Sequence, residues 1–337
     1  MNEQTNGITR RDFVRQIGIG SAAMAAAVAV SGNVLGATTI KNGMGYRTLG
    51  RTGLEISEVG MGAGSISPSG SNLIRAALSQ GINFIETSSN YTHAQVEIAI
   101  GQTVKSIGNR DKVCILTKTG NLEMGRMLTS SASEVEKAMR EELEGSLKRL
   151  QMDHVDVYIC PYQANSPQEA TLPAVHEALD KFKKEGKVRF TGLSSHYNYV
   201  NTCMAAIEGG YFDVLLFPIN FATLNAQIRN TVLEARKEGK AMRKNERPIL
   251  DVSELLKTAQ RKNIGVIGIK GAQDGFLPPL IHGTLMGEFA KDTKLSFHQM
   301  AYRYVLDQPQ VSTVAIRMAN MLHLSEALVL PQKTLKG

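Results

Sequence analysis

The chain alternates between short apolar runs and longer amphipathic segments over most of its length. Eight apolar runs have the length of buried strands, at residues 59–61, 83–85, 113–117, 155–160, 188–193, 214–217, 264–269 and 311–316. Amphipathic segments with helical spacing lie between them, at residues 133–150, 168–185, 199–208, 252–262 and 296–306. Strands that are apolar throughout are typical of parallel sheets covered on both faces. Eight such units in one uninterrupted chain predict an α/β fold of the (β/α)8 TIM barrel type, not an open sheet.

Length and composition agree with a single barrel. The chain has 337 residues, and a barrel of this type commonly needs about 250. Aromatic residues make up 6% of the chain and tryptophan is absent, so we expect a core of aliphatic side chains. Because no linker-like change in composition divides the chain, we place one barrel domain at residues 46–330.

The run at residues 83–85 leads into a carboxylate, a polar turn and a phenol. Glu86 follows the run directly, a Ser/Asn cluster comes next, and Tyr91 closes the turn. Lys118 directly follows the neighbouring run at residues 113–117. Because barrel enzymes carry their active sites at the carboxyl ends of the strands, we expect these three side chains to line the active site.

Three segments of the chain resemble one known family. Their sequences are YRTLGRTGL at residues 46–54, GINFIETSSNYTHAQVEIAIG at residues 81–101 and GKVRFTGLSS at residues 186–195. They resemble the aldo-keto reductase family, and the resemblance continues in order over residues 46–328. It implies a (β/α)8 barrel that transfers a hydride between NADP(H) and a small-molecule carbonyl or alcohol.

The resemblance also implies roles for the three side chains. Tyr91 stands at the family's proton-donating tyrosine, Lys118 at the lysine that lowers its pKa, and Glu86 at the acidic residue that holds the lysine. A phenol with a pKa near 10 is a poor acid at neutral pH until a cation favours the phenolate. Glu86 replaces an aspartate and is one methylene longer, so its carboxylate must fold back to reach Lys118. A shift of about 1 Å in such a site can cost on the order of 100-fold in rate.

The family's carbonyl-orienting histidine is missing. Pro161 occupies its position and offers no hydrogen-bonding side chain. His93, His154 and His196 are the histidines that could take its place in space, and the sequence does not choose among them. Of the four catalytic positions that the resemblance implies, Tyr91 and Lys118 therefore have the usual residue, whereas Glu86 and Pro161 do not.

The positions that would bind the nucleotide also depart from the family pattern. Ser195 replaces the asparagine, and Leu216 the glutamine, that bind the nicotinamide carboxamide. Arg317 replaces a glycine, where it would either pair with a phosphate or fill the site and exclude the nucleotide. We expect NADP(H) as the cofactor and, because no metal-ligand spacing is present, no metal. The residues expected to contact the nucleotide are Ser194, Ser195, Lys270, Arg317, Asn320 and Glu326.

The N-terminus resembles a twin-arginine export signal. Arg10 and Arg11 precede an uncharged Ala/Gly-rich run at residues 17–30. The alternative is a first helix that contains two arginines by chance. We interpret residues 1–37 as a signal peptide that lies outside the fold and is recognised by the twin-arginine export machinery. We therefore expect the protein in the periplasm or cell envelope. Cleavage and retention as an anchor both stay open, and we expect membrane contact only through this segment.

Charge and cysteine content exclude some other functions. The net charge of +7 is spread along the chain except for basic residues at 236–247. We interpret this cluster as a solvated surface, with a docking surface for an anionic partner as the alternative, and we do not expect nucleic-acid binding. The cluster lies in one of two long connections, residues 222–250 and 270–295, which follow strand ends and could cover the active-site mouth.

The three cysteines, Cys114, Cys160 and Cys203, indicate neither a disulfide framework nor a metal motif.

The sequence leaves two functions open. The leading one is an exported, NADP-dependent oxidoreductase with Tyr91 as general acid. The alternative is a catalytically degenerate barrel that works as a binding or interaction protein in the envelope, favoured by Pro161, Leu216 and Arg317. A variant of the first keeps a tightly held nucleotide that is reduced and reoxidised in place.

Overall fold

In the computed structural model of the chain, the described residues are 38–238, 248–272 and 295–330. The predicted export signal at residues 1–37 lies outside them. So do residues 239–247 of the basic cluster and residues 273–294 of the second long connection. Among the described helices, none combines the length and the apolar character that crossing a membrane requires.

Eight parallel strands close into a barrel at the centre of the structure. Their order around the barrel is β10-β11-β4-β5-β6-β7-β8-β9, so strands that follow one another in sequence lie side by side. Each overlaps one of the eight predicted runs, and the predicted TIM barrel is confirmed. The strands are β4 (Val59–Gly62), β5 (Phe84–Glu86), β6 (Cys114–Lys118), β7 (Val155–Ile159), β8 (Val188–Ser194), β9 (Val214–Pro218), β10 (Gly265–Ile269) and β11 (Thr313–Arg317).

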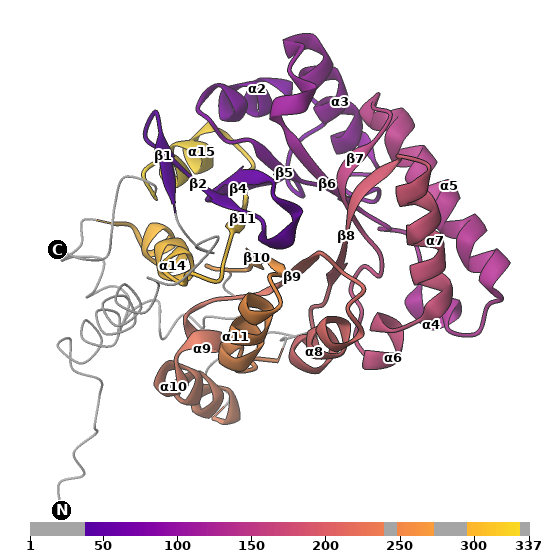
Figure 1. The fold of residues 1–337 in the computed structure, drawn as a ribbon. Coiled ribbons are helices and arrows are strands. Elements are labelled where there is room, and N and C mark those ends of the chain that lie inside the picture. The colour runs from indigo at the N-terminus through magenta and orange to yellow at the C-terminus, as the bar shows by residue number, and fades with distance from the viewer. Residues whose placement is uncertain (1–37, 239–247, 273–294, 331–337) are drawn as a thin grey trace, which may run out of the picture.

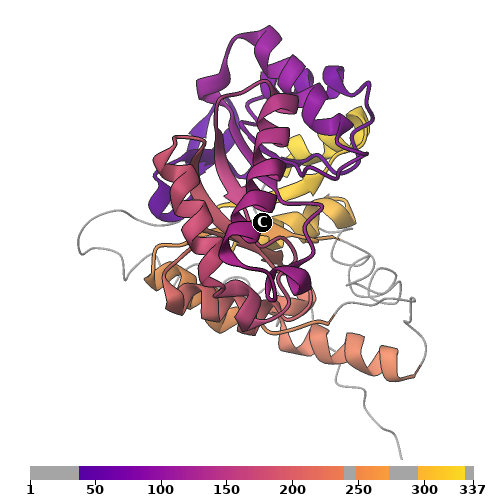
Figure 2. The same ribbon diagram turned by 90° about the vertical axis from the view of Figure 1, so that its right-hand side faces the viewer.

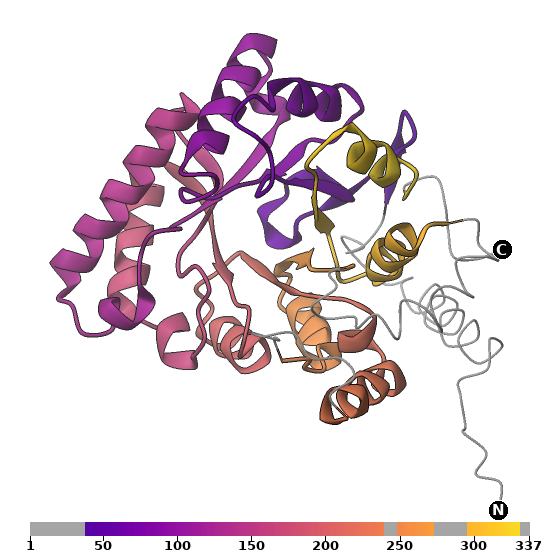
Figure 3. The same cartoon turned by 180° about the vertical axis from the view of Figure 1, so that it is seen from behind.

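Helices surround this barrel, as Figure 1 shows. α14 and α15 lie next to one another beside β11 in both Figure 1 and the view from behind in Figure 3. The helices of the described residues are α2 (Ser71–Ser79), α3 (Gln95–Ile107), α4 (Met124–Met127), α5 (Ala132–Leu150), α6 (Pro167–Ala170), α7 (Pro173–Lys184), α8 (Tyr199–Gly209), α9 (Phe221–Leu224), α10 (Ala226–Lys237), α11 (Ser253–Arg261), α14 (Phe297–Leu306) and α15 (Met321–Leu328), with 3-10 turns η1 (Gly50–Thr52) and η2 (Arg110–Lys112).

Two predicted segments differ from the structure. The helix predicted at residues 168–185 is divided into α6 and α7, because Pro173 begins a new helix at a position that proline favours. The connection predicted at residues 222–250 contains α9 and α10, whose first turns are capped by the side chains of Asn220 and Asn225. In Figure 2, α10 extends away from the other helices.

A three-stranded antiparallel sheet precedes the barrel and was not predicted. It consists of β1 (Thr39–Lys41), β2 (Met44–Thr48) and β3 (Glu55–Ser57). Between β2 and β3, Leu49 is fully buried and packs in the cluster of side chains that fills the barrel. A Cβ atom at Gly50 would lie 2.1 Å from the backbone nitrogen of Gly265, the first residue of β10. The sheet therefore closes the amino-terminal end of the barrel, opposite the predicted active site.

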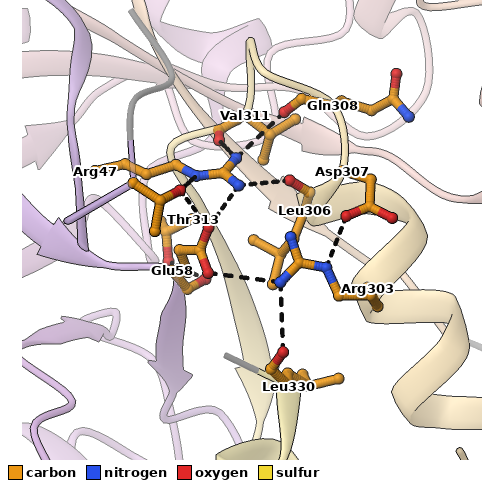
Figure 4. Close-up of polar contacts among 10 residues, drawn as sticks. Arg47, Glu58, Arg303, Leu306, Asp307, Gln308, Val311, Thr313 and Leu330 are labelled. Carbon is orange, nitrogen blue, oxygen red and sulfur yellow. Dashed lines mark hydrogen bonds and ion pairs between the residues drawn. The ribbon is translucent and has the colours of Figure 1, made fainter. Parts of the chain in front are cut away.

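A buried charge network joins this sheet to α14 (Figure 4). Glu58, which follows β3, lies 2.5 Å from an Arg47 guanidinium nitrogen and 3.6 Å from one of Arg303. Arg303 also donates to Asp307 at 2.8 Å. Arg47 donates further to the backbone carbonyls of Leu306, the last residue of α14, at 2.7 Å and of Val311, just before β11, at 2.8 Å. Glu58 is thus the carboxylate that two buried arginines share.

Candidate active site

The carboxyl ends of β5 and β6 bring the three predicted side chains together. In the register of these strands Glu86 lies opposite Leu116, so Glu86 and Lys118 end their strands at the same edge. Tyr91 lies in the turn that follows β5. Lys118 is among the largest fully buried side chains of the described barrel. A lysine in this position needs a partner, because an unpaired buried charge is strongly unfavourable.

One carboxylate oxygen of Glu86 provides that partner. Glu86 Oε1 forms an ion pair with Lys118 Nζ and also accepts a hydrogen bond from Tyr91 Oη at 3.0 Å. Lys118 Nζ donates to the backbone carbonyl of Thr87 at 2.6 Å and lies 3.2 Å from Tyr91 Oη. The longer side chain of glutamate therefore reaches the lysine and the tyrosine at once.

The surroundings keep the Tyr91 phenol protonated. Burial in the first place, and the Glu86 carboxylate in the second, raise the pKa of Tyr91 well above its usual value. Burial lowers the pKa of Lys118, and the charge of Glu86 opposes that shift. The resemblance implied a tyrosine whose pKa a lysine lowers; here the charge of Lys118 is already paired with Glu86. The site therefore contains the neutral phenol of Tyr91 beside the Lys118–Glu86 ion pair.

The three side chains lie in a cavity of about 480 Å³. Ligand sites in proteins commonly have volumes of roughly 300–1,000 Å³. Of the predicted site residues, those that line this cavity are Glu86, Tyr91, Lys118, Lys270, Arg317 and Glu326. The cavity thus joins the acid–base side chains to the charged positions expected to hold a nucleotide.

The other predicted contacts do not line the cavity. The backbone nitrogen of His323 donates to the Asn320 side chain at 3.0 Å, so Asn320 caps the start of α15. Ser194 and Ser195 are fully buried at the end of β8. The Ser195 hydroxyl has no hydrogen-bond partner within the described residues. A buried hydroxyl left without a partner is unfavourable.

The walls of the cavity fit a nucleotide. Leu216, Ile269 and Ile316 provide apolar surface for a flat ring. Arg317 donates from Nε to the hydroxyl of Ser65 and remains exposed, so its other guanidinium nitrogens can meet a phosphate. No group of three or more potential metal ligands occurs among the described residues.

The sequence analysis missed or left undecided several residues of the site, and two of them lie near Tyr91 or interact with it. His196 lines the cavity with Tyr91 and Lys118, whereas His93 and His154 do not. His196 Nε2 lies 3.5 Å from the Ser194 hydroxyl. Its position in the loop that follows the predicted strand at residues 188–193 was the signal that could have singled it out.

Tyr162 is the second such residue. It follows the cis Cys160–Pro161 bond, and its ring centroid lies 6.1 Å from that of His196, edge to face. A hydrogen bond with Tyr162 contributes to the raised pKa of Tyr91. Pro161 stands where the resemblance implies a histidine, and the rings of Tyr162 and His196 lie close by in the same part of the site.

Fold and site together define a (β/α)8 barrel whose tyrosine, lysine and carboxylate line a cavity of about 480 Å³. The sequence model of the Aldo/keto reductase family matches residues 58–335 of the chain. The chain therefore belongs to the aldo/keto reductase family, a family of oxidoreductases.

Individual relatives agree with this assignment. L-galactose dehydrogenase of Arabidopsis thaliana is 27% identical over 309 residues, 83% of this chain and 86% of the relative. Aldo-keto reductase YhdN of Bacillus subtilis (strain 168) is 34% identical over 162 residues, 45% of this chain and 47% of the relative, so that match spans about half of its length. An aldo-keto reductase structure from Klebsiella pneumoniae in complex with NADPH matches with a TM-score of 0.63 and 19% identity, over 89% of this chain and 92% of that one. The last match shows likeness of fold.

Proposed function

We propose that the protein is an NADP-dependent oxidoreductase that acts on a small-molecule carbonyl or alcohol. The observation that carries this proposal is the meeting of Tyr91, Lys118 and Glu86 in one cavity with Arg317 and Lys270. A bound nicotinamide supplies or accepts the hydride. Tyr91 exchanges the proton with the substrate oxygen, Lys118 holds Glu86 in place, and His196 orients the substrate oxygen in place of the missing histidine.

The relatives support the cofactor and the substrate class. The Klebsiella protein was solved with NADPH, and the Arabidopsis relative is named for the oxidation of a sugar. We infer NADP(H) and a hydroxyl- or carbonyl-bearing substrate from these names and from the phosphate-pairing position of Arg317.

Turnover with defined substrates tests this function. The full-length chain is assayed at 340 nm with NADPH and a panel of aldehydes and ketones, and with NADP+ and a panel of alcohols. We expect turnover that falls by roughly 100-fold or more in Tyr91→Phe, since a positioned proton donor contributes about 10²–10⁴-fold. NADPH affinity should be the same in that variant. Equal turnover of wild type and Tyr91→Phe would remove Tyr91 from the mechanism.

A second candidate function rests on the departures from the family pattern. Pro161, Leu216 and Arg317 replace groups that relatives use for the carbonyl and the nucleotide, which favours a barrel that binds a partner without redox chemistry. A wild-type protein that binds neither NADPH nor NADH, but is captured at the cell envelope, would support this candidate over the first.

We also propose export by the twin-arginine machinery to the periplasm or cell envelope. The support is the pair Arg10 and Arg11 before the apolar run at residues 17–30, all outside the described residues. Fractionation of cells that express the full chain is the test. The protein should move to the cytoplasm when both arginines are replaced by lysine, and an unchanged distribution would exclude this route.

A further inference from the structure

Hydrogen bonds join the turn that carries the site's tyrosine to the turn that follows its lysine. Tyr91 belongs to the turn after β5, and Lys118 is the last residue of β6. The backbone nitrogen of Ser89 donates to the Lys118 carbonyl at 3.3 Å. The side-chain amide of Asn90 donates to the Gly120 carbonyl at 2.8 Å. The two turns therefore lie directly against each other.

The hydroxyl of Ser89 is the centre of this contact. It is buried, and it accepts hydrogen bonds from the backbone nitrogen of Gly120 at 2.9 Å and from the side-chain amide of Asn121 at 3.3 Å. It donates to one carboxylate oxygen of Glu142 at 2.5 Å. The other Glu142 oxygen accepts from the Asn121 amide at 3.0 Å. Since a hydroxyl has one proton and two lone pairs, every hydrogen-bonding position of Ser89 is used.

Glu142 reaches this hydroxyl from outside the barrel. It lies on α5, one of the helices that surround the barrel in Figure 1. Of the described residues that line the cavity, none belongs to α5. A hydrogen bond to an ionised carboxylate is roughly twice as strong as one between neutral groups. Glu142 therefore anchors the Ser89 hydroxyl more firmly than a neutral acceptor would.

We propose that Glu142 is a positioning residue of the active site, which through Ser89 fixes the separation of the Tyr91 phenol and the Lys118 ammonium group. This inference rests on the proposed function, in which these two groups lie 3.2 Å apart. Ser89 precedes Tyr91 by two residues, and Gly120, which donates to Ser89, follows Lys118 by two residues. A shift of about 1 Å in such a site can cost on the order of 100-fold in rate.

The close packing of the two turns supports this role. A Cβ atom on Gly120 would lie 2.5 Å from the side-chain carbonyl carbon of Asn90 and 2.6 Å from the hydroxyl oxygen of Ser88. Groups packed at this distance leave no room for one turn to move alone, because close-packed interiors transmit strain. A displacement of Ser89 is therefore passed to the turn that follows Lys118.

The same bonds also tie α5 to the loops beside it, and stability alone is the alternative explanation for them. The two roles differ in what a variant changes. A loss of stability lowers the melting temperature and leaves the turnover of folded molecules as it was. A loss of positioning lowers kcat in molecules that are still folded.

Two variants remove the anchor, and a third serves as control. Glu142→Gln keeps the size and one acceptor oxygen, so either Ser89 or Asn121 loses its acceptor. Ser89→Ala removes the hydroxyl itself. Glu144→Gln is the matched control on the same helix, because the Glu144 carboxylate pairs with Lys187 at 2.7 Å and not with either turn. Thermal melting shows whether each variant is folded.

The first readout needs neither nucleotide nor substrate. Amide hydrogen exchange of the full-length chain is followed by mass spectrometry of its peptides. Exchange of residues 88–91 and 118–121 should be about fivefold faster or more in Glu142→Gln and Ser89→Ala than in wild type and Glu144→Gln, because the local opening costs less free energy. Unchanged exchange in these two segments, or faster exchange spread evenly over the barrel, would overturn the proposal.

The second readout is the split between kcat and KM in the turnover assay. In Glu142→Gln and Ser89→Ala, kcat should fall about tenfold or more, while the KM of the substrate and the Kd of NADPH stay as in wild type and Glu144→Gln. Because Glu142 acts through Ser89, the double variant should lose no more than Ser89→Ala alone. Losses in kcat that multiply in the double variant, or an unchanged kcat in both single variants, would contradict the positioning role.

Failure of the proposed function has a different signature. If wild type neither binds nucleotide nor turns over any substrate, the proposed function fails and the positioning role fails with it. The hydrogen exchange of the two segments still reports whether Glu142 holds the turns together.

Discussion

Replacing Glu58 by glutamine should strongly destabilise the fold without touching the active site. Glu58 is 2% exposed and is shared by Arg47 and Arg303, each 6% exposed. Glutamine keeps the size and one acceptor oxygen but removes the negative charge. Two buried guanidinium groups then lie close together with backbone carbonyls, the Thr38 hydroxyl and, for Arg303, Asp307 as their remaining partners.

The magnitude follows from the loss of one partner in a buried ion network. Such a loss typically costs about 3–5 kcal/mol, because the remaining charge stays buried and unpaired. Arg47 keeps close bonds to the Leu306 and Val311 carbonyls, so we place Glu58→Gln near the lower end, at about 3 kcal/mol. An unfolding entropy of roughly 2 cal/mol/K per residue converts this loss to a fall in Tm of about 5 °C for a folded unit of this size.

Thermal and urea unfolding of the full-length chain measure this change. Glu55→Gln is the matched control, because Glu55 pairs with Lys41 at the surface, where both side chains are about half exposed. An exposed pair contributes roughly 0–1 kcal/mol, so the control should melt within about 2 °C of wild type. If Glu58→Gln melts no lower than Glu55→Gln, the buried network does not hold the sheet to α14 as described.

Three further predictions concern the nucleotide cleft and the pH response. Arg317→Ala should weaken NADPH binding about tenfold or more, because the variant loses a charged hydrogen bond to a phosphate. Tighter NADPH binding in this variant would show that Arg317 blocks the cleft. Leu216→Gln buries an amide without a partner, so it should lower the stability of the protein without nucleotide by about 1–3 kcal/mol. Added NADPH should restore most of the lost stability, because the nicotinamide carboxamide would pair with the new amide. Thermal melting with and without nucleotide measures both effects. Hydrogen bonds from Arg140 and Lys187 lower the pKa of Glu185 to about 2. The stability that Glu185 contributes is therefore present above its ordinary pKa of 4.5 and is lost as the pH falls toward 2. Because Glu185 is largely exposed, wild type and Glu185→Gln should differ by under about 1 kcal/mol at neutral pH and converge in acid unfolding curves.

The barrel was predictable because its strands carry an unambiguous pattern. β6, β7 and β9 are buried at every residue, and their side chains are apolar apart from Asp156 in β7 and Thr117 and Lys118 at the end of β6. α10 was not predicted because its exposed face carries the start of the basic cluster, which favoured a solvated connection. The sheet β1–β3 was missed because its first strand is exposed throughout and its strands are only three to five residues long.

The three central members of the site were predictable, and their hydrogen bonds were not. Strand ends placed Glu86, Tyr91 and Lys118 together, and the structure brings them into contact. The sequence could not show that one oxygen of Glu86 serves both partners, since this depends on how the extra methylene folds. Asn320 was expected to touch the nucleotide, yet its side chain caps α15, a local role that the family pattern does not distinguish.

Nucleotide binding tests the central claim most directly. The full-length chain is titrated with NADPH and with NADH, and binding is followed by the emission of the nucleotide itself, because the chain contains no tryptophan. A mass measurement checks for nucleotide retained through purification. We expect NADPH to bind with a micromolar or tighter Kd, equally in wild type and Tyr91→Phe. No binding of either nucleotide, and none retained, would contradict hydride transfer in this barrel.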